Sequence, residues 1–301
     1  MGNATRFAML AACVGIASIA APALANVISF DPDGSGVLAP INVASFDLLP
    51  GSSLNEAVIP GQVGSTATVL FQARLGSFLD GSGKVIQVPG LNDPSNANHF
   101  QITVTAQFNV TITAQTTAAG TQTTVLALAA SQPTNFIHYY YSNALSGGQL
   151  TAVDLAGTGF TDGTLIANGS ATSVNAVFTA LTSVAPTNLD NFGNNDWAGT
   201  STVTGVGGTS FDASISFADP RWFLSPVTAL SGNTTDALSY QQADPSKKFF
   251  GTVTPNLGAI NGASGPDIEF QTDGVTSFIP EPASLLLLAT GAAALLSRRR
   301  K

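Results

Sequence analysis

Apolar and polar residues alternate without a break over residues 100–113, where every even position is apolar and every odd position is Gln, Asn or Thr. A period of two places one face of a β-strand against a core and the other face in water. A helix would instead spread these apolar side chains around its whole circumference. Residues 210–217 alternate in the same way, so the pattern predicts two amphipathic strands.

Weaker patterns predict further strands, with turn-forming residues between them. The strand segments are 66–75, 123–129, 135–142, 149–155, 172–182, 200–206 and 267–271. The turn formers include Asp80-Gly81-Ser82-Gly83 and Asn168-Gly169. Many strands with Gly- and Asn-rich turns and threonine-rich outer faces are typical of an all-β chain, here an antiparallel β-sandwich. Residues 26–279 are expected to form it as one large domain or two smaller ones.

Residues 1–25 have the pattern of a secretion signal. A single positive charge, Arg6, precedes a run of small and apolar residues over 7–21. Ala23 and Ala25 then stand three and one residues before the polar chain begins, which is the small-residue pattern that a signal peptidase accepts. The apolar run is shorter than the ~20 residues of a transmembrane helix. We therefore expect cleavage after Ala25.

The other end of the chain combines an apolar stretch with terminal basic residues. Residues 283–297 are almost wholly apolar, and residues 298–301 are all basic. As a helix the apolar stretch would be roughly 22 Å long, less than the ~30 Å hydrocarbon core of a bilayer. It predicts a marginal single-helix anchor whose basic end stays in the cytoplasm, with the body of the chain outside.

Together with the residues just before it, this end resembles the PEP-CTERM sorting signal of Gram-negative bacteria. The resemblance covers residues 280–301, as a short motif, an apolar stretch and terminal arginines in that order. It implies that an exosortase recognises and removes the tail after transient anchoring in the inner membrane. The residues that carry it are Pro280, Glu281, Pro282, Arg298, Arg299 and Arg300.

The exported part is acidic and free of cysteine. Residues 26–279 hold 5 Lys and Arg against 17 Asp and Glu, a net charge of −12, whereas the whole chain has −8. Nucleic acid is therefore not an expected partner, because it binds basic patches. The single cysteine, Cys13, lies in the signal. Residues 10–13 match the sequence pattern of a lipoprotein cleavage site. A lipoprotein signal would need its apolar core before the cysteine, but here the apolar run continues past Cys13. This favours cleavage after Ala25.

No arrangement of residues points to catalysis. The exported part has no Gly-x-Ser-x-Gly, and its two histidines, His99 and His138, lack zinc-site spacing. We therefore expect no enzyme activity, no catalytic residue and no cofactor. Calcium is the one ion left open, because Asp31 and Asp33 precede a glycine turn. An EF-hand would also need a glutamate where Asn42 stands, and a plain turn explains the two aspartates equally well.

Several stretches of the exported part resemble the flocculation-associated PEP-CTERM proteins. That resemblance implies a secreted, non-enzymatic protein of the cell surface or extracellular matrix, which helps polysaccharide-producing cells to aggregate. The alternative is a polysaccharide-binding module or a weak glycan hydrolase, because aromatic side chains stack on sugars and paired carboxylates hydrolyse them. The aromatic candidates are Trp197, Trp222 and Tyr139 to Tyr141. The stretches behind the resemblance are residues 30–34, 46–51, 155–165, 190–193 and 219–220.

Overall fold

The computed structural model describes residues 27–56, 62–129, 134–152, 156–185, 187–188, 199–202, 205–236, 247–261 and 266–281. Within these ranges the chain forms strands and turns and no helix. The predicted signal peptide, and the tail beyond Glu281, lie outside the described residues. The all-β class is confirmed.

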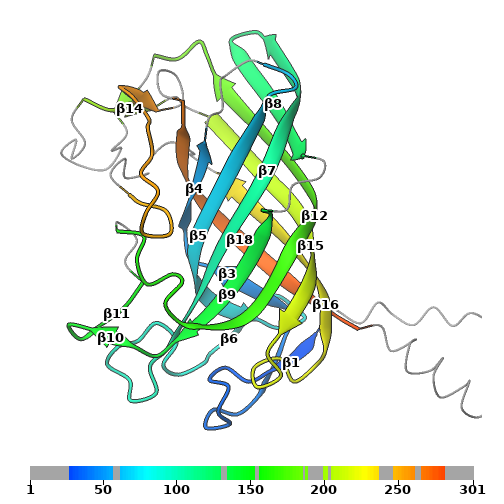
Figure 1. The fold of residues 1–301 in the computed structure, drawn as a ribbon, viewed down its shortest axis with the longest axis vertical. Coiled ribbons are helices and arrows are strands. Elements are labelled where there is room, and N and C mark those ends of the chain that lie inside the picture. Colours follow the sequence, from blue (N-terminus) through cyan, green and yellow to red (C-terminus); the bar gives the residue numbers. More distant parts are fainter. Residues whose placement is uncertain are drawn as a thin grey trace, which may run out of the picture.

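The strands follow one another in the order of their labels (Figure 1). Their bounds are β1 Ile28–Phe30, β2 Ile41–Val43, β3 Ser45–Leu48, β4 Gly51–Glu56, β5 Thr66–Leu79, β6 Val85–Ile86, β7 Gln101–Ala118, β8 Thr121–Leu128 and β9 Phe136–Ser142. The remainder are β10 Leu145–Ser146, β11 Gln149–Leu150, β12 Thr164–Leu181, β13 Thr187–Asn188, β14 Ser201–Thr202, β15 Gly205–Ala218, β16 Val227–Asp236, β17 Ile260–Asn261 and β18 Ile268–Pro280. Both strands predicted from strict alternation are present as parts of β7 and β15.

One antiparallel sheet contains the long strands and closes on itself (Figure 1). Around the sheet, β5 is followed by the short strands β3 and β4, which share one position. The next strands are β18, β16, β15 and β12. The short strands β8 and β9 share the following position, and β7 is last. The circle is completed because β7 pairs with β5 over nine residue pairs, from Thr66 with Thr111 to Arg74 with Thr103. The short strands β8 and β9 lie end to end beside β7, which pairs with β9 in its first half and with β8 in its second half.

The predicted β-sandwich is therefore wrong in its architecture, because a sandwich packs two sheets face to face. The strands β5 and β15 are 14 residues long, and β7 and β12 are 18. Strands of this length accumulate enough twist and tilt for the first and last of them to meet. Irregularities add curvature. The Asn168-Gly169 pair, predicted as a turn, is one of these register shifts inside β12, where a side chain at 169 would strike the carbonyl oxygen of Ser214 at 2.4 Å.

Aromatic rings fill the interior at the end of the closed sheet where β1 lies. Phe46 is the centre of this cluster, with ring centroids 5.1 Å from Phe30, 5.2 Å from Phe78 and 5.1 Å from Phe278. Phe223 completes it at 4.8 Å from Phe278. All five rings are buried. Residues from both ends of the described chain thus stabilise the same part of the core.

Two segments outside the sheet cover part of its outer face. The Gln101 side-chain amide donates to the Thr151 hydroxyl at 2.9 Å, and the Thr103 hydroxyl donates to the carbonyl of Phe160 at 2.7 Å. On β5, the Gln72 amide donates to the carbonyl of Lys248 at 2.9 Å. The polar face predicted to meet water is accordingly buried at these positions, because residues distant in sequence pack over it.

Candidate functional site

The sorting motif begins where β18 ends. Pro280 is the last residue of β18 and pairs with Val227 at the start of β16. The Glu281 N–H donates to the carbonyl of Pro226 at 3.1 Å, so the first two motif residues are held against the body of the protein. The other predicted site residues, Pro282, Arg298, Arg299 and Arg300 of the motif and Ala23 and Ala25 of the signal cleavage site, lie outside the described residues.

The N-terminal end of the described chain lies at the same end of the sheet. The Ser29 N–H donates to the Ser225 hydroxyl at 2.9 Å, and the Leu224 N–H donates to the carbonyl of Ser29 at 3.0 Å. Ser225 is next to Pro226, which holds Glu281. The chain therefore enters and leaves the closed sheet beside the turn that joins β15 to β16. We call this part, residues 218–227, the β15–β16 turn.

A polar groove of about 460 Å³ opens beside the β15–β16 turn. Its walls come from the loop after β1, the loop before β7, the end of β9 and the turn itself. The lining residues that carry the argument are Asp33, His99, Tyr141, Asn143, Arg221 and Trp222. Mixed aromatic, amide and charged groups of this kind can hydrogen-bond and stack on a polar ring-shaped ligand.

Arg221 gives this groove its positive charge. Its guanidinium Nη2 lies 2.7 Å from Oδ2 of Asp219, and its Cζ stands 4.6 Å from the centroid of the Trp222 ring. The hydrogen bond from Arg221 lowers the pKa of the Asp219 carboxyl below its usual value. The Arg221 side chain is 61% exposed, so the ion pair itself is screened by water. The arginine is available to a ligand on its open side.

Trp222 and Tyr141 form the aromatic wall of the groove. Trp222 is buried, and no described residue accepts a hydrogen bond from its Nε1. Tyr141 stacks on Phe100 with centroids 5.7 Å apart and lies 5.3 Å from the Trp222 ring. Burial, with the nearby Asp33 and Asp31 carboxylates adding to it, raises the pKa of Tyr141 to about 12, so its hydroxyl stays protonated. The other predicted sugar-stacking residues differ: Tyr139 is wholly inside, donating to Thr276 at 2.9 Å, and Trp197 lies outside the described residues.

Asp31 and Asp33, the pair left open for calcium, turn their carboxylates onto their own loop. Asp31 accepts hydrogen bonds from the N–H groups of Asp33 at 3.2 Å, Gly34 at 3.1 Å and Gly36 at 2.9 Å. Burial, and the neighbouring Asp33, raise the pKa of Asp31. Gly34 is required here, because its φ is +63° and an added Cβ would strike the Trp222 ring. Calcium would compete with these backbone donors.

The two histidines of the exported part lie in different surroundings. The ring nitrogens of His99 each lie 2.9 Å from a carbonyl oxygen, Nδ1 from Asn96 and Nε2 from Asn143, so the ring joins two loops. His138 stacks on Phe136 with centroids 4.5 Å apart, and its Nδ1 lies 3.2 Å from the Tyr140 hydroxyl. Burial lowers the pKa of His138. In the described ranges, no three His, Cys, Asp or Glu side chains gather as a metal site would need.

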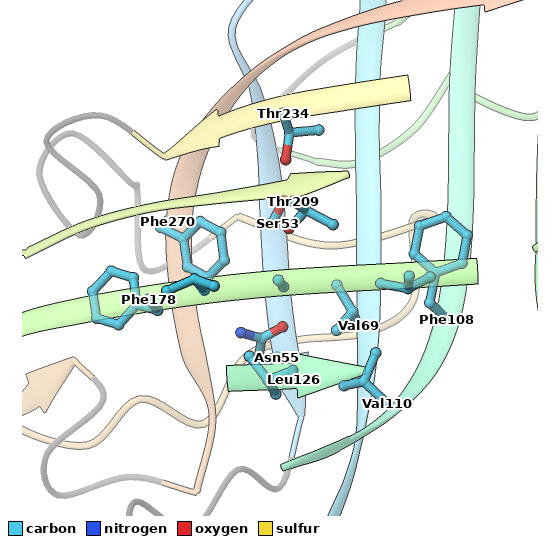
Figure 2. A pocket seen from close by; sticks show the side chains of 13 residues that line it. Ser53, Asn55, Val69, Phe108, Val110, Leu126, Phe178, Thr209, Thr234 and Phe270 are labelled. Carbon is cyan, nitrogen blue, oxygen red and sulfur yellow. The ribbon is translucent and has the colours of Figure 1, made fainter. Parts of the chain in front are cut away.

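The interior at the opposite end of the sheet holds a cavity that the sequence did not indicate. Figure 2 shows side chains from β4, β5, β7, β8, β12, β15, β16 and β18 converging on it. Its free volume is about 50 Å³, and a second space of about 40 Å³ lies against the same Val69 and Phe108 side chains. Pockets for small molecules usually have about 300–1,000 Å³. The cavity is therefore a region of looser packing rather than a ligand pocket.

The protein thus has an acidic all-β body, and both ends of its described chain lie beside the β15–β16 turn and its grooves. Residues 278–301 match the family described as the PEP-CTERM protein-sorting motif. This match confirms the sorting tail, and the motif implies an exosortase-dependent, secreted protein associated with the cell surface. The chain matches no curated protein and no solved structure. Within the described ranges, no helix is long and apolar enough to cross a membrane.

Proposed function

We propose that this protein is a non-enzymatic component of the surface or extracellular matrix of an exopolysaccharide-producing Gram-negative bacterium, where it promotes flocculation or cell aggregation. The observation that carries the proposal is the sorting motif at residues 278–301. Loss of the tail, residues 280–301, would release the body with β18 still paired to β16 through Ile279. Signal peptidase and exosortase are the processing partners, and exopolysaccharide is the expected matrix partner.

Processing is tested on the secreted protein itself. Mass spectrometry of culture supernatant should find no chain that ends at Lys301. Replacing Pro280, Glu281 and Pro282 with Ala should leave the tail attached and the protein in the membrane fraction. Asp162→Ala, which removes an exposed carboxylate elsewhere, is the control and should be processed normally. Extracellular material that still carries residues 298–301 would contradict exosortase processing.

Aggregation is tested in the native host. Deletion of the gene should reduce floc formation, and expression of the whole chain should restore it. A chain truncated after Pro280 should be exported without passing through the sorting step, so it separates the role of the tail from that of the body. Unchanged flocs and unchanged matrix composition in the deletion strain would refute the proposed role.

The alternative function is polysaccharide binding in the polar groove. It is supported by Tyr141, Trp222 and Arg221 meeting around about 460 Å³ of open space. Binding is favoured over hydrolysis, because Asp33 is the one carboxylate among the described lining residues and glycosidases use two. The purified body should be retained on the host polysaccharide without releasing sugars. Arg221→Ala should weaken retention, whereas Lys84→Ala, an exposed cation in another turn, should not.

A further inference from the structure

Apolar side chains are exposed at the end of the closed sheet from which both chain ends leave. The β15–β16 turn and the end of β15 form a groove of about 410 Å³, lined by Phe217, Pro220, Leu224, Pro226 and Val227 among others. Phe217 is 41% exposed and Leu224 is 47% exposed. Large exposed apolar side chains that share one groove mark a contact surface more often than isolated ones do.

The tail places this groove close to a membrane. The Glu281 N–H is hydrogen-bonded to the carbonyl of Pro226, which lines the groove. The continuous run of leucines in the tail begins at Leu285. Four residues span at most ~14 Å of extended chain. The polar headgroup layer on each side of a bilayer is roughly 5–8 Å thick. A tail inserted in the bilayer therefore holds the groove within reach of the headgroup layer.

The N-terminal end of the described chain lies at the same end of the sheet. Ser29 is hydrogen-bonded to Ser225 and Leu224, and the apolar run of the signal ends at Ala21. Before either segment is removed, the precursor would be tied to the membrane at two points beside one groove. Two tethers at one end orient the body better than one tether does, because a single flexible linker allows rotation.

We infer that this end of the protein rests on the outer face of the inner membrane while the tail is attached, with Phe217 and Leu224 in contact with lipid. The inference rests on the proposed exosortase sorting. The lipid partner is a zwitterionic surface, because the exported part has a net charge of −12 and an anionic surface would repel it.

Removal of the tail would end this contact. Two half-exposed side chains bind lipid weakly alone, but a tether raises their effective concentration at the surface. Once the tail is cut, that advantage is lost and the body leaves the membrane.

The test uses single cysteines, because the chain after the signal has none. The chain from Asn26 to Lys301 carries Leu224→Cys or, as the matched control, Val177→Cys; both parent residues are 47% exposed. Val177 lies nine positions along β12 from Asn168, the partner of Phe217, or ~30 Å away at ~3.3 Å per residue. Each cysteine is labelled with an environment-sensitive fluorophore, and the chain is reconstituted into phosphatidylcholine vesicles.

The expected result is that both labelled chains float with the vesicles, while the fluorophore emission shifts to the blue at position 224 and stays unchanged at 177. Flotation without a shift at 224 overturns the lipid contact and leaves the tail anchor intact. Failure to float overturns the anchor, and the contact with it. Equal blue shifts at both positions would overturn the inference in favour of general adsorption to the vesicles. A blue shift at position 224 that needs no lipid and grows with protein concentration would overturn it in favour of self-association.

Discussion

The two ends of the closed sheet are built on the same inward-facing alternation but are packed differently. At the tail end, Phe46 touches three other buried rings at centroid distances of 5.1 to 5.2 Å. At the opposite end the interior is lined largely by smaller side chains such as Val69 and Val110, and about 50 Å³ stays free (Figure 2). Side-chain size at inward positions, rather than strand pattern, therefore decides where the interior is filled and where space stays free.

This difference matters for function because both chain ends leave from the packed end. The strand pair at Pro280 and the isolated bridge between Phe30 and Phe223 join the two ends of the described chain to the aromatic cluster. Tension on either tether would act on the part of the core that is most tightly packed. The opposite end carries no attachment among the described residues and can tolerate looser packing.

The largest effect is expected at the centre of the packed end. Phe46→Ala should lower the free energy of unfolding by about 3–5 kcal/mol, since a fully buried ring is lost and a cavity is left. Denaturant titration measures it. Phe217→Ala is the matched control: the same substitution at an exposed ring should change the stability by roughly 0.5 kcal/mol or less. Similar values for the two would mean that the aromatic cluster does not organise this end.

A smaller effect is expected from a ring beside the cavity. Phe108 is buried and contacts Phe211 at 5.4 Å, but it also borders free space. Phe108→Ala should therefore cost about 3 kcal/mol, at the low end for a buried ring. Gln107→Ala, on the outer face of the same strand, should cost less than about 1 kcal/mol. Thermal melts of both variants check this, and equal effects at 107 and 108 would refute the orientation of β7.

One substitution should have opposite signs at two inward positions of the sheet. Ala176 borders the cavity, so Ala176→Val should fill free space and stabilise the fold by about 0.5–1 kcal/mol. Ala73 is buried where β5 packs closely on Gly51, so Ala73→Val should destabilise it by about 1–3 kcal/mol. Both exchanges carry the same change in strand propensity, which cancels in the comparison. If both variants were destabilised alike, the cavity would be absent in solution.

The smallest effect concerns pH, again with opposite signs. The pKa of Asp219 is lowered, first of all by Arg221, so its ionised form contributes stability that is lost as the pH falls below about 4. The pKa of Glu56 is raised, mainly by burial and also by Asp267, so stability falls as the pH rises from the ordinary glutamate pKa of about 4 through the raised one.

Two amide variants measure these contributions. At pH 7, Asp219→Asn should lower the melting temperature and Glu56→Gln should raise it. At a pH low enough to protonate both carboxyls in the folded protein as well as in the unfolded chain, each variant should melt close to the unchanged protein. A pH-independent difference for either variant would assign its effect to packing or hydrogen bonding instead of charge.

Local pattern was sufficient for much of the wall of the sheet. The alternation over residues 100–113 predicted which side chains of β7 face inward, and Ile102, Val104 and Phe108 are buried as expected. It failed for β4 and β16, which were not predicted. Their sequences, Gly51–Glu56 and Val227–Asp236, are rich in Ser, Asn and Thr, so few apolar side chains mark the inward face. Pairing with β5 and β15 forms these strands where propensity alone would not.

The sequence by itself determined the sorting tail, the acidic charge balance of residues 26–279, their lack of cysteine and the period-two strands. These depend on runs of residues that are adjacent in the chain. Tertiary structure alone decided that β7 meets β5 to close the sheet, that Gln72 and Gln101 are buried beneath distant segments, and that Arg221, Tyr141 and Asp33 share one groove. The reason is physical: each of these features requires contacts between residues far apart in sequence, and no local pattern encodes which distant segment will supply them.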